Sequence, residues 1–185
     1  SPAGKGIFID VRDGQKGKVS LTANNVSVSG VANHGIHISD CDLADECGGG
    51  GGGAGGGSPA SIEVTLNGVS VDRVGYGRFD ADGLRVDERN TGNIVFNAWN
   101  SSFTYVGADG VELDEGQGGN VKVKVSSTVF NDNGGYCDPD LLEPFLPDPD
   151  EAEFDPGEFS EAEFEELIRP IHESPDPRCI EVEVD

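Results

Sequence analysis

Two stretches of this sequence repeat the same arrangement of carboxylates around apolar residues. The first reads Asp-Gly-Leu-Arg-Val-Asp-Glu over residues 82–88, and the second reads Asp-Gly-Val-Glu-Leu-Asp-Glu over residues 109–115. A spacing of 27 residues suits one structural repeat, which would place equivalent carboxylates next to one another. Stacked carboxylates repel each other, so they need a cation, a basic side chain or a proton between them.

Two interpretations of these carboxylates stay open. Calcium takes roughly six to eight oxygen ligands, and the repeat offers them from Asp87, Asp114, Glu88 and Glu115, with Asp82 and Asp109 nearby. Alternatively, the acids form a solvated face that Arg85 and diffuse sodium neutralise. The first interpretation predicts a specific divalent-cation site, and the second predicts none.

Catalysis is a third use for the same residue types. Glycoside hydrolases need a pair of carboxylic acids at the bond they cut, and the predicted stack places Arg85 among Asp87, Asp114 and Glu112. No phosphate-binding loop and no GxSxG elbow accompanies these residues. We therefore expect Arg85 to be an ion-pair partner. His37 could be a metal ligand or an acid–base group, but we expect it to be solvent-exposed.

The residues around these motifs alternate between apolar and polar side chains, which is the pattern of a strand with one buried face. Related strands are predicted at residues 6–10, 35–39 and 179–183. Stacking them predicts two inward columns: Ile7, Ile36, Leu84 and Val111, and beside it Ile9, Ile38, Val86 and Leu113. The outward columns would be Phe8, His37, Arg85, Glu112 and Glu181, and then Asp10, Ser39, Asp87, Asp114 and Glu183.

Two further families of strands lie between these. One covers residues 19–23, 62–66, 94–98 and 121–125, and a shorter one covers 26–28, 69–71, 103–105 and 129–130. Three strands in a repeat of about 28 residues, separated by Gly, Asn and Asp turns, predict one triangular coil. The fold class is therefore all-β, a short right-handed parallel β-helix of about four coils. An antiparallel sandwich would give no reason for near-identical repeats.

Two segments depart from the repeat within what we expect to be a single domain over residues 1–185. Residues 48–58 form a Gly-rich loop that is expected to be flexible. Residues 138–178 form an acidic, Pro-rich insert with 15 acids and eight of the ten prolines. Within it, Ser160 and Glu163 make a capping box that predicts a short helix over residues 160–168.

The four cysteines indicate where the protein folds. Their number is even, and no spacing matches a zinc knuckle or a CxxC redox motif. Two local disulfides, Cys41–Cys47 and Cys137–Cys179, are the simplest of the three possible pairings. Disulfides form in oxidising compartments, so we expect an extracellular, cell-surface or periplasmic protein.

The charge of the chain limits its partners. The formal net charge is −23, from 35 acids and 12 bases, and such a charge repels nucleic acids and anionic membranes. No apolar run reaches the roughly 18 residues of a membrane span. The charge favours divalent cations or basic partners, and a glycan is a candidate partner only through the enzyme alternative below.

Residues 107–115 and 118–134 resemble secreted bacterial right-handed parallel β-helix repeat proteins of the pectate-lyase-like superfold, and residues 137–144 resemble an insertion in uncharacterised members. The resemblance covers most of residues 6–136 and the last strand. Polysaccharide lyases of this superfold use calcium-binding carboxylates with a nearby Arg or Lys as base. The resemblance thus implies the fold, but no lyase or polygalacturonase signature is present, and about four coils are few for a long substrate cleft.

We therefore expect a noncatalytic module for surface binding or self-assembly, with calcium as a candidate stabilising ion. The alternative is a carbohydrate-active enzyme, or the remnant of one, acting at Arg85, Asp87, Asp114 and Glu112. Both ends of the predicted solenoid lack a recognisable cap, which predicts end-to-end contacts between chains or with further coils. Lys122 and Lys124 alternate with valines, so they should face outward and discourage the sheet from pairing with itself.

Overall fold

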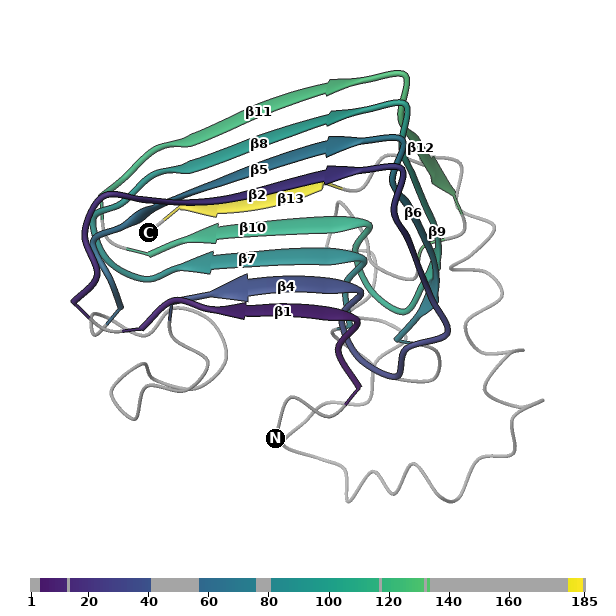
Figure 1. Ribbon diagram of the computed structural model, residues 1–185, viewed down its shortest axis with the longest axis horizontal. Helices are drawn as coiled ribbons and strands as arrows, with labels where there is room; N and C mark the ends of the chain where they lie inside the picture. Colours follow the sequence, from purple (N-terminus) through teal and green to yellow (C-terminus); the bar gives the residue numbers. More distant parts are fainter. Residues whose placement is uncertain are drawn as a thin grey trace, which may run out of the picture.

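The computed structural model describes residues 4–12, 14–40, 57–75, 81–116, 118–131, 133 and 180–184. These residues form thirteen β-strands, and no helix occurs among them. The strands lie in three sheets, and every strand pairing within them is parallel. This all-β arrangement is consistent with the predicted parallel β-helix (Figure 1). Within the described ranges, no helix is long and apolar enough to cross a membrane.

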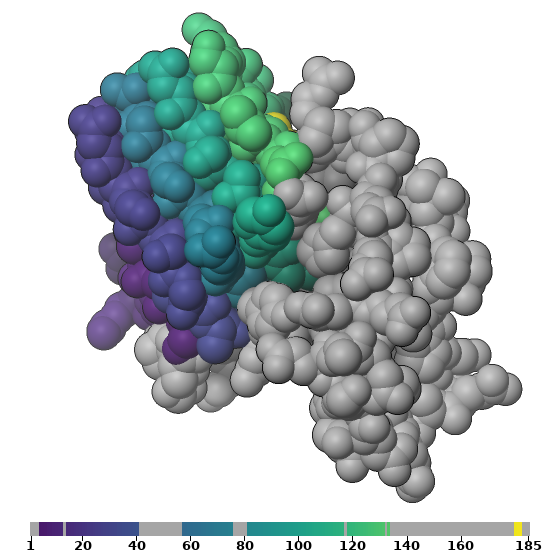
Figure 2. Space-filling model, turned by 90° about the vertical axis from the view of Figure 1, so that its right-hand side faces the viewer, coloured from purple at the N-terminus to yellow at the C-terminus, as the bar shows by residue number. Residues whose placement is uncertain are grey.

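Each sheet collects one of the three strand families. Sheet A has the order β1-β4-β7-β10-β13, with bounds Ile7–Asp10, Ile36–Ser39, Leu84–Glu88, Val111–Glu115 and Ile180–Val184. Sheet B has the order β2-β5-β8-β11, with bounds Lys18–Asn24, Ser61–Asn67, Ile94–Trp99 and Val121–Ser126. Sheet C has the order β3-β6-β9-β12, with bounds Ser27–Ser29, Ser70–Val74, Ser102–Val106 and Val129–Asn131. One strand from each sheet, taken in chain order, makes one layer of the fold. Successive strands of a sheet therefore belong to successive layers, which appear as colour bands in Figure 2.

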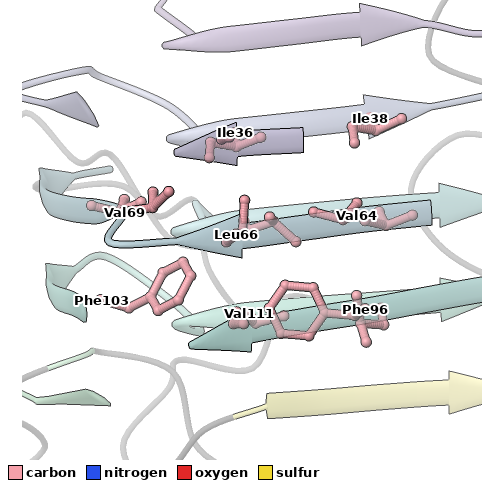
Figure 3. Packing of buried hydrophobic residues seen from close by; sticks show 14 of the residues in the cluster. Ile36, Ile38, Val64, Leu66, Val69, Phe96, Phe103 and Val111 are labelled. Atoms are coloured by element: carbon pink, nitrogen blue, oxygen red, sulfur yellow. The ribbon is translucent and has the colours of Figure 1, made fainter. Parts of the chain in front are cut away.

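The predicted register of sheet A is confirmed. Ile36 pairs with Leu84, which pairs with Val111, and the neighbouring column runs through Ile38, Val86 and Leu113. These six side chains are fully buried. They pack against the inward residues of sheets B and C, among them Val64, Leu66, Phe96 and Phe103 (Figure 3).

Glycines set the spacing at the start of each sheet A strand. A methyl group on Gly35 would lie 2.6 Å from the carbonyl oxygen of Gly83, and one on Gly83 would lie 2.5 Å from that of Gly110. Such approaches are too close for a carbon and an oxygen, so no larger residue fits the ladder. This explains why a glycine stands just before the apolar column in β1, β4, β7 and β10.

The corner between sheets B and C explains the small polar residues between those strands. Asn25, Gly68, Asn100 and Ser127 occupy equivalent places and all have positive φ, between 49° and 64°. Asn and Gly tolerate this left-handed conformation better than other residues. The corner can therefore turn within one or two residues, which keeps the adjacent layers in register.

Several predictions fall outside the described residues. These are the four cysteines with their two disulfides, the insert at 138–178 and its helix at 160–168. Of the Gly-rich stretch at 48–58, only Gly57 and Ser58 are described, and both are buried. The Ser58 amide donates to Asp40 and its hydroxyl donates to the Gln15 carbonyl, while the rest of the predicted loop lies outside the described residues.

Candidate functional site

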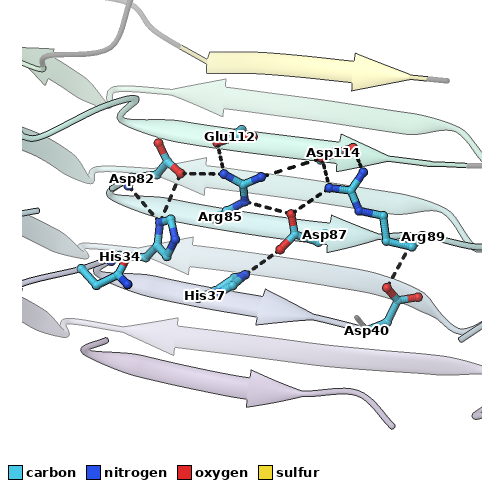
Figure 4. Close-up of polar contacts among 10 residues, drawn as sticks. His34, His37, Asp40, Asp82, Arg85, Asp87, Arg89, Glu112 and Asp114 are labelled. Carbon is cyan, nitrogen blue, oxygen red and sulfur yellow. Dashed lines mark hydrogen bonds and ion pairs between the residues drawn. The ribbon is translucent and has the colours of Figure 1, made fainter. Parts of the chain in front are cut away.

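The candidate site lies on the face of sheet A opposite to the hydrophobic core. Leu84 and Val86 point into the core, so Arg85 and Asp87, which alternate with them, lie on the other face. The register places Arg85 between His37 and Glu112, and it places Asp87 beside Asp114. The structure thus brings together the predicted carboxylates and arginine. We define the sheet A network as His34, His37, Asp40, Asp82, Arg85, Asp87, Arg89, Glu112 and Asp114 (Figure 4).

Arg85 is the centre of the network. Its Nε donates to Asp87 Oδ1 at 2.9 Å, and its Nη1 donates to Glu112 Oε2 at 2.8 Å. Carboxylate oxygens of Asp82 and Asp114 lie 3.6 and 3.9 Å from its Nη atoms. The expectation that Arg85 is an ion-pair partner is therefore confirmed.

Arg89 is a second arginine in the network, and sequence reasoning did not single it out. Both of its Nη atoms donate to the carboxylate of Asp114, with a distance of 2.7 Å from Nη1 to Oδ1. Its Nη2 also lies 3.5 Å from Asp87 Oδ1. The one available signal was its place, directly after the repeated motif, where the second copy has Gly116.

The two histidines join the network from the loop before β4 and from β4 itself. His37 Nε2 lies 2.6 Å from Asp87 Oδ2, and the His34 ring nitrogen Nδ1 accepts the Asp82 backbone N–H at 3.0 Å. His37 is only 3% exposed, so the expectation of a solvent-exposed residue is wrong. Burial lowers the pKa of His37, and the hydrogen bond and charge of Asp87 offset only part of this effect.

The carboxylates are buried as well, which corrects the interpretation of a solvated acidic face. Asp87 is 6% exposed and Asp114 is 1% exposed. The prediction is wrong because β7 and β10 are buried at every position, on both faces of the sheet. Burial alone would raise the pKa of Asp87, but the hydrogen bond from His37 and the charge of Arg85 hold it below its usual range.

A second column of carboxyl groups follows at the end of the sheet A strands. Glu88 and Glu115 are register partners in adjacent strands and are fully buried, and Asp40 lies in the neighbouring layer. Glu88 Oε1 accepts the backbone N–H of Asn90 at 3.3 Å, and Glu115 Oε1 accepts that of Gly119 at 2.6 Å. Within the described part of the chain, the Oε2 atom of each glutamate has no hydrogen-bond partner.

Burial changes the titration of this column. It raises the pKa of Glu88 to about 7, and the nearby charges of Asp40 and Glu115 act in the same direction. Burial also raises the pKa of Asp40 to about 6, although its hydrogen bonds from the Ser58 and Arg89 amides oppose the change. Both groups therefore favour the protonated form more strongly in the folded protein than in the unfolded chain.

We expect Glu88 and Asp40 to destabilise the fold as the pH rises from about 4 to about 8. The protonated Glu88 and Asp40 stabilise the fold fully below their unfolded pKa values, and this contribution disappears as the pH passes their folded values of about 7 and 6. Glu88→Gln keeps a neutral side chain and should remove a pH-dependent loss on the order of 2–3 kcal/mol. Urea unfolding at several pH values measures this.

Thr65→Ser, on β5 of sheet B, is a suitable control for this measurement, because it removes no ionisable group. It should leave the slope of stability against pH as it is in the wild type. Asp87 contributes to the pH dependence of stability with the opposite sign, because its pKa is lowered, but only below about pH 4. His37 also contributes with the opposite sign, because burial lowers its pKa, so the decisive quantity is the difference between Glu88→Gln and the wild type. A difference in unfolding free energy that stays the same from pH 4 to pH 8 would contradict the raised pKa of Glu88.

The metal-ligand prediction finds no direct support in this geometry. Among the described residues, no group of three or more His, Cys, Asp or Glu side chains is arranged to hold a metal ion. Of the four predicted ligands, Asp87 and Asp114 are bound by the two arginines, while Glu88 and Glu115 lie in the neighbouring column. Calcium binding stays a prediction.

Comparison with known proteins adds no identification, because no family model, curated protein or solved structure matches this chain.

Proposed function

We propose that this chain is a noncatalytic module of a secreted protein, built on a short right-handed parallel β-helix and used for surface binding or self-assembly. One observation supports this most strongly. The side chains with catalytic potential, Arg85 and the carboxylates around it, are buried and are paired with one another. The groups of such a network are bound to one another, whereas a catalytic site has to present its groups to a substrate.

The charge state of Arg85 also supports a noncatalytic role. Burial alone would lower its pKa, but the charges of Asp87 and Glu112 outweigh burial and raise the pKa above its ordinary value. A base that removes a proton from a sugar ring must give up its own proton near the working pH. Arg85 holds its proton too firmly for that role.

The ends of the sheets support the self-assembly part of the proposal. Strands β2 and β3 are edge strands at one end, and β11 and β12 are edge strands at the other. Each edge has backbone groups that can pair with a further strand. The proposed location outside the cytoplasm rests on the four cysteines in the sequence.

A carbohydrate-active enzyme is the second candidate, and one observation favours it. Three carboxylates, those of Asp87, Glu112 and Asp114, surround one arginine on a single face of a parallel sheet. Glycoside hydrolases and lyases need such a grouping of acids. The burial of all four side chains is the reason for which we place this candidate second.

A glycan screen separates the two candidates. We expect no release of reducing ends or unsaturated products from polyuronates or from neutral glycans, with or without calcium. Arg85→Ala should be as inactive as the wild type. Product release by the wild type would overturn the noncatalytic proposal. Its loss in an Arg85→Ala variant that circular dichroism shows to be folded, while Arg73→Ala retains it, would favour the enzyme with Arg85 in its site.

A further inference from the structure

The two sheets end at different heights at the end of the molecule where β13 lies. Among the described residues, sheet A has five strands and sheet B has four, so β10 pairs with β13 while no described strand pairs with β11 on the same side. Val182 of β13 continues the buried column of Leu113, and Val123 of β11 continues that of Phe96. Nevertheless Val182 is 44% exposed and Val123 is 39% exposed. Two inward apolar side chains are thus partly exposed where sheet A extends one strand beyond sheet B. We call this difference between the two sheets the step.

The two edge strands at this step carry opposite charges at the same spacing. Strand β11 reads Val-Lys-Val-Lys-Val over residues 121–125, and β13 reads Ile-Glu-Val-Glu-Val over residues 180–184. Lys122 and Lys124 are exposed and have no ion-pair partner among the described residues. In its own sheet β13 has an acidic neighbour, since Glu181 is the register partner of Glu112.

We propose that two copies of this chain associate end to end, with β13 of each copy pairing with β11 of the other. This inference rests on the proposed self-assembly and names the surfaces that meet. The strands of sheets A and B run in opposite directions (Figure 1), so a two-fold axis along the strands places β13 antiparallel to β11 of the second copy. The extra strand of each sheet A then fills the step in the other copy.

This pairing brings opposite charges together and also covers the two exposed valines. In the antiparallel register, Val182 covers Val123 of the second copy, Glu181 lies opposite Lys124, and Glu183 lies opposite Lys122. Cross-strand pairs of opposite charge stabilise a sheet, and like charges directly opposite destabilise it. The contact is isologous, so it occurs twice and closes at two copies.

Other end-to-end arrangements are less favourable. Pairing β11 with β11 of a second copy sets lysines against lysines, and pairing β13 with β13 sets glutamates against glutamates. Stacking β1 of a second copy on β13 leaves the position above β11 empty, because sheet B is one strand shorter. The second copy therefore fits best through the same end of the molecule.

A charge-exchange experiment tests the pairing by sedimentation velocity over a micromolar concentration series. We expect the wild type to dimerise, and Lys122→Glu/Lys124→Glu and Glu181→Lys/Glu183→Lys each to raise the dissociation constant at least about tenfold. An equimolar mixture of the two variants should form heterodimers, because each strand then meets an opposite charge. Lys18→Glu, on β2 at the other end, is the control and should dimerise like the wild type.

Circular dichroism verifies that each variant folds. If the charge-reversed variant Lys122→Glu/Lys124→Glu does not fold, the neutral variant Lys122→Gln/Lys124→Gln takes its place. Dimers that both double variants leave unchanged, or filaments in place of dimers, would overturn the β11–β13 pairing while leaving self-assembly intact. A strict monomer at high micromolar concentration would overturn both the pairing and self-assembly. The glycan screen then judges the noncatalytic part of the proposed function independently.

Discussion

Replacing Arg85 with alanine is expected to lower the free energy of unfolding by about 3–5 kcal/mol. The guanidinium bonds Asp87 and Glu112 at 2.9 and 2.8 Å in a buried setting. Without it, the buried Glu112 carboxylate loses its 2.8 Å donor. Asp87 keeps its contacts with His37 and Arg89, but it loses the guanidinium donor at 2.9 Å. The desolvation of charges that have lost part of their counter-charge is the main cost of this substitution. Urea unfolding followed by circular dichroism measures it.

Arg73→Ala is the matched control for this prediction. Arg73 also pairs with an aspartate, Asp72, at 3.2 Å, but 72% of its side chain is exposed. Water screens such a pair, so its loss should cost less than about 1 kcal/mol. Equal effects of the two substitutions would show that the sheet A network contributes no more than a surface ion pair, and the structural role we assign to it would be wrong.

The register of sheet A was predictable because the sequence repeats almost word for word. When residues 82–88 and 109–115 carry the same alternation, only one pairing keeps every apolar residue on the core side. The pairing of Asp87 with Asp114 and of Glu88 with Glu115 follows from that alternation alone. The third sheet was less obvious, since β3 and β12 have only three residues each.

Burial of the polar face of sheet A could not be predicted in the same way. Alternation tells which residues share a face, and it leaves open whether the polar face meets water. A run such as Leu-Arg-Val-Asp-Glu looks like a strand with one wet side, yet all five residues are buried. The sequence therefore led to an exposed His37, which the structure corrects. Of the two interpretations that it left open for Asp87, the structure corrects the solvated face.

The partners of the carboxylates were also hidden from sequence reasoning. Asp40, His34 and Arg89 lie outside the strands themselves, in the segments that precede or follow them. Such residues reach the network because the chain turns near them, and turn geometry is not encoded in the alternation of the strands. Asp40, for example, accepts backbone N–H groups from Ser58 and Arg89, which are 18 and 49 residues away.

Replacing Phe96 with alanine is expected to cost about 3–5 kcal/mol of unfolding free energy. Phe96 is fully buried, and it is stacked between Val64 of β5 and Val123 of β11. Both neighbours are valines whose short, branched side chains cannot move into the space of a phenyl ring. A cavity would remain, and the cost of burying less apolar surface would add to the cost of the cavity.

The layered arrangement should enlarge this effect, because each layer contacts only the layers next to it. Phe96 and Phe103 belong to the same layer and are the two largest fully buried side chains among the described residues. Weakening this layer therefore weakens the contact between β5 and β8 as well as that between β8 and β11. Tyr105→Ala, which removes a half-exposed aromatic ring from the same layer, is the control and should cost less than about 1 kcal/mol. If Phe96→Ala and Tyr105→Ala lowered the urea midpoint equally, the packing between layers would not be the main source of stability.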